Sequence, residues 1–166
     1  RSGLTRAEAR GNRAGMLSSK AKYAVRAAIM LAEKDGGWVH AADVAERALI
    51  PRKYLEAIFV QLRDHGLVES RRGARGGHRL MRPSADISVA DVIRLVDGPL
   101  AMTPCASRTR FHPCADCVAI EDCRIRHVMQ RARDAVAAVL ENCSLAELAA
   151  LPGDTRAATL DKVMDC

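Results

Sequence analysis

The sequence predicts a mainly α-helical protein: a winged helix-turn-helix with a two-stranded wing, followed by a long C-terminal dimerisation helix. Two short amphipathic helices joined by a tight turn lead into a Gly- and Arg-rich hairpin at residues 67–82. A regular apolar heptad pattern follows at residues 125–143. Only five of the 166 residues are aromatic, so the core must use Ala, Leu, Val and Ile, a composition that favours helices.

The chain divides into five expected segments. Residues 1–15 lack an apolar period and are rich in Arg and Gly, which predicts a disordered leader or an expression remnant. An Arg-rich transit peptide and a DNA-gripping arm are alternative interpretations of this leader. The winged helix-turn-helix domain is expected at residues 16–98. The cysteine-rich cluster loop, the dimerisation helix with a short capping helix, and a flexible tail are expected at residues 99–123, 124–151 and 152–166.

The first two helices are defined by caps and breakers. Ser18 or Ser19 is a candidate N-cap for a helix that runs to about Lys34, and the following Asp-Gly-Gly ends it. A second, short helix is expected over residues 41–48.

A third helix is expected from Pro51, at a first-turn position, to about His65, with Gly66 ending it. Its apolar side chains recur at helical spacing and are predicted to be buried: Leu55, Ile58, Phe59 and Leu62.

Two short strands are expected at residues 67–71 and 78–82. Between them lies Arg72-Gly-Ala-Arg-Gly-Gly77, a turn whose glycines permit positive φ and a close approach of the backbone to a phosphate. A hairpin that follows a helix-turn-helix is a wing, and its arginines are placed for a minor groove or a phosphate ridge.

Charge is unevenly distributed and favours a polyanionic partner for the first half. Residues 16–82 carry 13 basic and 7 acidic side chains, whereas residues 83–166 carry 9 basic and 12 acidic. The arginines are expected on phosphates, and Lys53, Tyr54 or Gln61 on base edges. The candidate DNA-binding residues are Arg52, Lys53, Tyr54, Gln61, Arg71, Arg72, Arg75, Gly76, Gly77, His78 and Arg79. The alternative is an interaction protein that offers its basic face to another partner.

Four cysteines occur within nineteen residues: Cys105, Cys114, Cys117 and Cys123. Soft ligands in a polar loop that leads into a helix are typical of a metal or iron–sulfur site. No secretory signal is present, so we expect reduced thiols in a cytoplasmic protein. The alternatives are a structural zinc site, a thiol-based redox switch, and an oxidoreductase that uses Cys114 and Cys117, although no βαβ pattern surrounds that pair.

From residue 123 onward the apolar residues step by four and three positions. They are Ile125, Met129, Ala132, Val136, Val139 and Cys143. This seam of about three heptads suits pairing with another helix along its length. Ser144 and Glu147 have capping-box spacing and open a last short helix.

Enzymatic motifs are lacking. There is no phosphate-binding Gly-rich loop after a strand, no His-Glu-x-x-His and no plausible Ser-His-Asp set. No stretch approaches the roughly 18 apolar residues of a membrane span. The sequence therefore predicts neither a catalyst nor a membrane protein, and no small-molecule substrate.

Together these motifs resemble the Rrf-type family of winged-helix repressors, the IscR-, NsrR- and RirA-like regulators. The resemblance covers about residues 16–150 and is carried by residues 16–24, 51–63, 66–80 and 87–94 and by the cysteine cluster. It implies a homodimer joined through the long helix, a palindromic operator in double-stranded DNA, and an iron–sulfur cluster ([2Fe–2S] or [4Fe–4S]) that tunes repression.

The ligands depart from the family pattern. Members of this family often use three cysteines, the last two separated by five residues, as Cys117 and Cys123 are here. Where one branch has a histidine ligand this chain has Arg126, and where another branch has an acidic residue it has Lys22. The chain supplies an additional cysteine instead. The hypothesis is a repressor with an all-cysteine cluster site and His127 in reserve; the alternative is a winged-helix regulator with zinc or a thiol switch.

Overall fold

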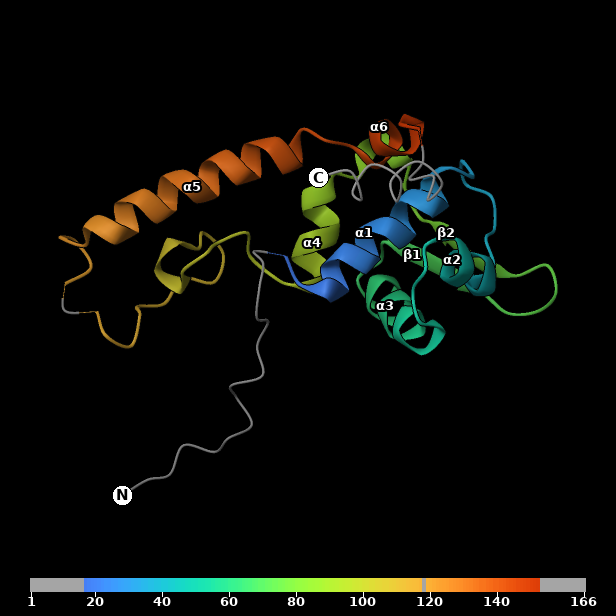
Figure 1. Ribbon diagram of the computed structural model, residues 1–166, viewed down its shortest axis with the longest axis horizontal. Coiled ribbons are helices and arrows are strands. Elements are labelled where there is room, and N and C mark those ends of the chain that lie inside the picture. Colours follow the sequence, from blue (N-terminus) through green and yellow to red (C-terminus); the bar gives the residue numbers. More distant parts are fainter. Residues whose placement is uncertain (1–16, 118, 153–166) are drawn as a thin grey trace, which may run out of the picture.

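The computed structural model describes residues 17–117 and 119–152, so the expected leader and nearly all of the expected tail lie outside the described residues. The main elements are α1 (Ser19–Ala32), α2 (Ala41–Arg47), α3 (Arg52–Asp64), β1 (Val68–Arg71), β2 (Gly77–Leu80), α4 (Val89–Val96), α5 (Arg124–Glu141) and α6 (Leu145–Ala150). Two 3₁₀ turns, η1 (Ser84–Asp86) and η2 (Pro104–Ala106), complete the fold. The predicted mainly helical architecture with a two-stranded wing is confirmed (Figure 1).

Helix α1 forms the centre of the winged part. Its buried side is made mostly of alanines, namely Ala21, Ala24, Ala27 and Ala28, together with Leu31. Because alanine is short, α3, α4 and α6 can all pack directly against this helix. Ser18 caps its start, since its Oγ accepts the Ala21 N–H at 3.0 Å, and Asp97 at the end of α4 accepts the Ser18 N–H at 2.9 Å.

Helices α2 and α3 form the helix-turn-helix, and the expected apolar side of α3 is fully buried. Pro51 is the N-cap of α3 and not its first helical residue, a small correction to the expected start. Strands β1 and β2 pair antiparallel, from Val68 opposite Leu80 to Arg71 opposite Gly77. The predicted wing is therefore present, with each strand slightly shorter than expected.

The long helix α5 leaves the winged part and α6 returns to it. No residue of α5 is buried in the single chain, and Ile125 and Val139 are 67% and 70% exposed. In contrast, Leu145 at the start of α6 is fully buried and its N–H donates to the Ile87 carbonyl at 2.9 Å. The sequence interpretation grouped α6 with the dimerisation helix, whereas the structure packs it on α1.

The wing and the cysteine loop lie at opposite ends of the molecule (Figure 1). The wing projects beyond α2 on one side, and residues 104–117 and 119–123 lie beneath the start of α5 on the other. Within the described residues, no helix is both long and apolar enough to cross a membrane.

Candidate nucleic-acid interface and cysteine loop

A cationic groove of about 460 Å³ lies between the start of α3 and the wing. Arg52 lines it from α3, and Arg71 and Arg72 line it from the wing. Asp43 is the one carboxylate among the described residues that line it. A concave surface with this balance of charge fits the phosphate backbone of a nucleic acid.

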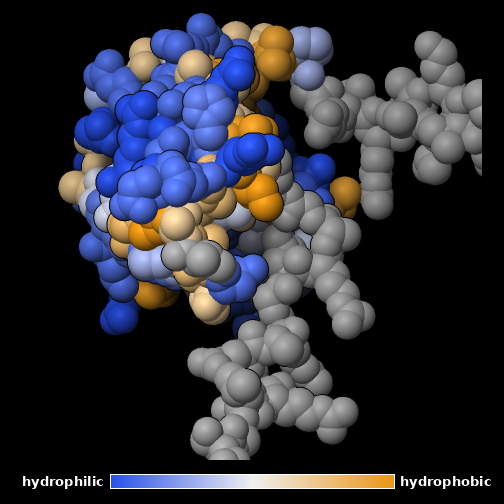
Figure 2. Space-filling model, turned by 90° about the vertical axis from the view of Figure 1, so that its left-hand side faces the viewer, coloured by the Kyte–Doolittle hydropathy of each residue, from blue (hydrophilic) through white to orange (hydrophobic). Residues whose placement is uncertain are grey.

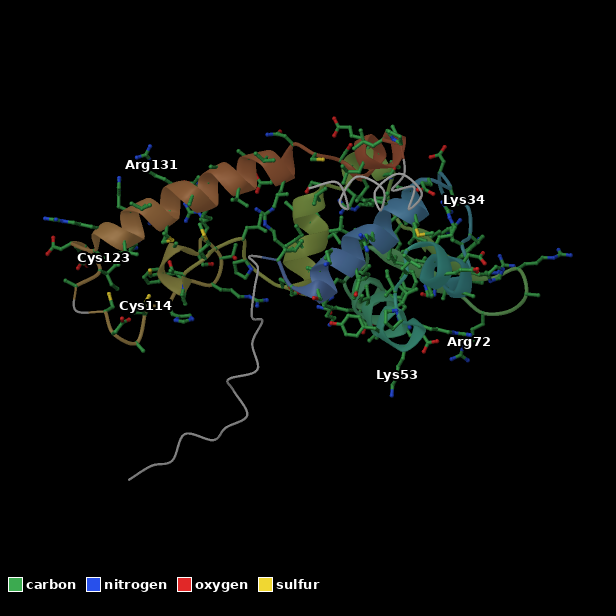
Figure 3. All side chains as sticks on the ribbon, viewed as in Figure 1. Lys34, Lys53, Arg72, Cys114, Cys123 and Arg131 are labelled. Atoms are coloured by element: carbon green, nitrogen blue, oxygen red, sulfur yellow. The ribbon has the colours of Figure 1, made fainter. Side chains whose placement is uncertain are left out.

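The first turn of α3 extends the cationic surface. Arg52, Lys53 and Tyr54 are all exposed. The Tyr54 ring meets Tyr23 edge-on, with 5.7 Å between ring centroids, so this ring is held in place from one side. Figure 3 shows Lys53 and Arg72 in the part of the molecule that carries α3 and the wing, away from Cys114 and Cys123.

Two predicted DNA-binding side chains have partners within the protein. Gln61 is half-buried and its Nε2 donates to the Leu95 carbonyl at 2.6 Å, which ties α3 to α4. Arg79 pairs with Glu69 at 2.8 Å, and its guanidinium lies 4.6 Å from the centre of the Trp38 ring. The side chains of Gln61 and Arg79 are thus engaged within the protein, and their contact with DNA stays a prediction.

Two residues of this region were not predicted from the sequence: one lines the groove, and the other contacts the arginines of the wing. His40 lines the groove at the start of α2, and Trp38 packs under the arginines of the wing. No spacing rule marks either residue, because both stand in the irregular link between α1 and α2. The single tryptophan of the chain was the only available signal.

The wing glycines have a steric role. A Cβ on Gly77, where φ is +135°, would lie 2.4 Å from the Val39 carbonyl oxygen, and a Cβ on Gly76 would lie 2.1 Å from the Arg71 carbonyl oxygen. Only glycine permits these approaches. Gly76 and Gly77 are thus required for the backbone conformation of the wing itself, whether or not they contact DNA.

We expect Gly77→Ala to lower the free energy of unfolding by about 1–3 kcal/mol, the usual cost of a strained backbone. Gly73→Ala is the matched control, because Gly73 also has positive φ (+102°) but a Cβ there meets nothing within 4 Å. Urea denaturation measures both variants. An equal loss of unfolding free energy in the two variants would show that the close approach of Gly77 to Val39 does not contribute to stability.

The cysteine loop brings two thiols together. Cys105 is buried in η2, and its Sγ lies 3.6 Å from Cys114 Sγ and 3.4 Å from Thr103 Oγ1. Cys117 follows Cys114 in a tight turn, in which the Cys117 N–H donates to the Cys114 carbonyl at 3.1 Å. Cys123 is the N-cap of α5, and its Sγ accepts the Arg126 N–H at 3.4 Å.

The two close thiols are not equivalent. The hydrogen bond with Thr103 lowers the pKa of Cys105, and the contact of Cys105 with Cys114 lowers this pKa further. Burial acts in the opposite direction and raises it. The same contact with Cys105 raises the pKa of Cys114, and burial adds to that rise. The Cys105 thiol therefore loses its proton first, and Cys114 remains the donor in the pair.

The donor chemistry of the loop fits an iron–sulfur cluster or zinc, since both prefer thiolates. Of the four candidate thiols, the structure places only Cys105 and Cys114 in contact. Across residues 17–117 and 119–152, no set of three or more Cys, His, Asp or Glu side chains is arranged to hold a metal ion, and His127 joins no such set.

Arginines of α5 hold the cysteine loop against the helix. Arg126 Nε donates to the Cys105 carbonyl at 3.2 Å, and Arg133 donates to the Ala106 carbonyl. Asp134 pairs with Arg108 of the loop at 2.9 Å. The pKa of Asp134 is lowered, chiefly by its hydrogen bond with Arg133. The sequence interpretation noted Arg126 only as a missing ligand and did not find this contact.

The helix-turn-helix, the wing and the cationic groove between them define a winged-helix DNA-binding protein. A profile of the Rrf2 family, described as an iron-dependent transcriptional regulator, matches residues 17–151. The chain belongs to the Rrf2 family of DNA-binding transcriptional regulators. The predicted family is thereby confirmed.

Named relatives agree with this assignment. A putative HTH-type, rrf2-like regulator of Rhodobacter capsulatus is 38% identical over 117 residues, 68% of this chain and 78% of the relative. The regulator IscR of Escherichia coli is 35% identical over 133 residues, 80% of this chain and 78% of IscR. These relatives are regulators and not enzymes, as the sequence predicted.

A solved structure of CymR, titled the global cysteine regulator of Bacillus subtilis, has a similar fold. The TM-score is 0.67 at 31% identity, and the match covers 82% of this chain and 98% of CymR.

Proposed function

We propose that the protein is a homodimeric repressor that binds a palindromic operator, and that its cysteine loop controls the affinity. Helix α3 enters the major groove, and the wing arginines lie on the adjacent backbone or minor groove. The observation that carries this proposal is the cationic groove, which joins Arg52 of α3 to Arg71 and Arg72 of the wing in one surface.

Helix α5 supports the homodimer, because its apolar pattern is symmetric about Ala132. Apolar residues lie three, four and seven positions away on each side: Met129 and Ala135, Val128 and Val136, and Ile125 and Val139. A helix with this symmetry matches a second copy running antiparallel across it, with the two-fold axis at Ala132. The small alanine allows the two helices to approach closely at the crossing point.

An apolar groove beside α5 offers further contact surface. It has a volume of about 930 Å³ and lies between α4, the segment after it, and the C-terminal half of α5; Ile93, Met102 and Val139 are among its lining residues. Viewed from the α5 end, the surface shows hydrophobic patches set among hydrophilic residues (Figure 2). We infer that the partner subunit covers this groove.

For the cysteine loop we infer an iron–sulfur cluster held by Cys105, Cys114, Cys117 and Cys123, with zinc as the alternative occupant. Four soft donors in one loop support this, as does the relation to IscR and to a family described as iron-dependent. A bound cluster would supply a redox-sensitive group. Arg126 and Arg133, which hold the loop on α5, would then connect its state to the dimer helix.

A thiol switch is the second candidate, favoured by the 3.6 Å separation of Cys105 Sγ and Cys114 Sγ. A peroxide would oxidise one thiolate to a sulfenic acid, and the other thiol would displace water to form the disulfide. In this step the two thiols lose two electrons and two protons, and the peroxide O–O bond is cleaved.

Two cysteine variants distinguish these candidates. We expect anaerobically purified protein to show visible absorption with stoichiometric iron and sulfide, and Cys123→Ser to abolish all three. Serine is a good N-cap, so α5 should keep its start in this variant. A Cys105–Cys114 disulfide would survive Cys123→Ser but not Cys105→Ser. Cys143→Ser, outside the loop, serves as the control.

Metal counts and thiol titration before and after peroxide measure these outcomes. Colourless protein with one zinc per chain would contradict the cluster and leave a structural zinc site. Colourless, metal-free protein with a reversible disulfide would leave the thiol switch.

A further inference from the structure

The imidazole of His78 lies flat against helix α3. Its ring centroid is 3.8 Å from that of Phe59, with 11° between the ring planes. Phe59 is 1% exposed and stands in the middle of α3. A wing residue thus packs face to face on a core aromatic of the DNA-reading helix.

The backbone of His78 joins the wing to the segment before α2. The His78 N–H donates to the Val39 carbonyl at 2.8 Å, and the Val39 N–H donates to the His78 carbonyl at 3.0 Å. This isolated bridge depends on Gly77, whose missing Cβ lets the two backbones approach. Val39 is itself buried, so the wing is fixed to the core at this point.

The edge of the same ring joins the two strands of the wing. His78 Nδ1 lies 2.9 Å from Ser70 Oγ, directly across the hairpin. His78 and Ser70 also both line the cationic groove. One half-buried side chain therefore touches α3, β1 and the groove.

We propose that His78 is a positioning residue that fixes the angle between the wing and α3, so that both meet adjacent grooves of one DNA duplex together. This assigns to His78 a role other than the direct DNA contact expected from the sequence. It rests on the proposed contact of the wing with DNA. A histidine suits the position because its flat ring stacks on Phe59 while its polar edge bonds Ser70; phenylalanine would keep only the stack, and glutamine only a polar group.

The charge state of the ring agrees with this role. Burial lowers the pKa of His78, and the neighbouring Arg63 lowers it further, so the ring is neutral at pH 7. A neutral ring packs on Phe59 without the cost of removing a charge from water.

The test combines protein variants with two DNA duplexes. A duplex selected by the wild-type protein from random DNA is compared with the same duplex shortened to remove the flank that the wing would reach. We expect the wild-type protein to bind the shortened duplex about tenfold more weakly, equivalent to about 1.4 kcal/mol. In His78→Ala we expect the full duplex to be bound as weakly as the short one, with no effect of the flank.

His78→Phe, which retains the stack, is expected to recover most of the flank effect. His65→Ala is the matched control, because His65 is an exposed histidine at the end of α3 and its Nδ1 bonds only the Gln61 carbonyl of the same helix.

The outcomes separate the two proposals. A wild-type protein that ignores the flank would refute the wing contact. If the wild-type protein senses the flank and His78→Ala still does so, the positioning role is overturned even where overall affinity has fallen. Should His78→Ala fail to fold, His78→Gln is judged by the same criterion, since it also removes the stack.

Discussion

Ala132→Glu is expected to convert the proposed homodimer into monomers and to weaken binding to a palindromic operator by about 100-fold or more, because two linked half-sites then have to be bound independently. The substitution would bring two carboxylates face to face at the proposed two-fold axis, in an apolar surface that otherwise closes against its copy. Burying unpaired like charges costs several kcal/mol. Analytical ultracentrifugation and titration of labelled operator measure the two effects.

Two further variants make this result specific. Ala138→Glu introduces the same charge on the same helix, but residue 138 is exposed and lies outside the symmetric apolar pattern, so the dimer should persist. A mixture of Ala132→Glu with Ala132→Lys should restore dimers, because opposite charges then meet at the axis. Monomers in the mixture, or intact dimers of Ala132→Glu alone, would place the interface elsewhere.

Replacing Arg72 and Arg75 by alanine is expected to weaken operator binding on the order of 100-fold and to flatten its salt dependence. The slope of log affinity against log salt should fall by about 0.9 for every phosphate contact removed. Both side chains are exposed on the wing, and Arg72 also lines the cationic groove. Fluorescence anisotropy over a range of salt concentrations gives both the affinity and the slope.

The control removes the same two charges elsewhere. Lys34 and Arg131 are exposed, and neither lines the cationic groove. Their replacement by alanine should leave the salt slope nearly unchanged. If both double variants lower the slope equally, the effect comes from net charge, and the wing has no special contact with the DNA.

Much of the fold could be predicted because its signals are local. The Ser18 N-cap, the Gly66 stop and the Ser144–Glu147 capping box each act within a few residues, and the structure places all of them as expected. The apolar spacing of α3 likewise identified Leu55, Ile58, Phe59 and Leu62 as core residues. Such patterns depend on helix geometry alone.

The partners of polar side chains could not be predicted in the same way. Gln61 looked like a base reader because it stands on an exposed-looking side of the recognition helix, yet its amide bonds α4, which is far away in the sequence. The same holds for Arg79, which is paired by Glu69 and covered by Trp38. Which polar groups remain available for DNA is decided by neighbours that sequence spacing does not reveal.

The sequence by itself determined the winged helix-turn-helix, the dense cysteine loop and the apolar heptad pattern of α5, because helix periodicity, turn chemistry and composition are properties of short segments. Only the tertiary structure decided that α6 packs on α1, that Cys105 contacts Cys114 among the four cysteines of the loop, and that His78 stacks on Phe59. Each of these contacts joins residues from separate elements. Their distances depend on how the whole core packs, and no local pattern contains that information.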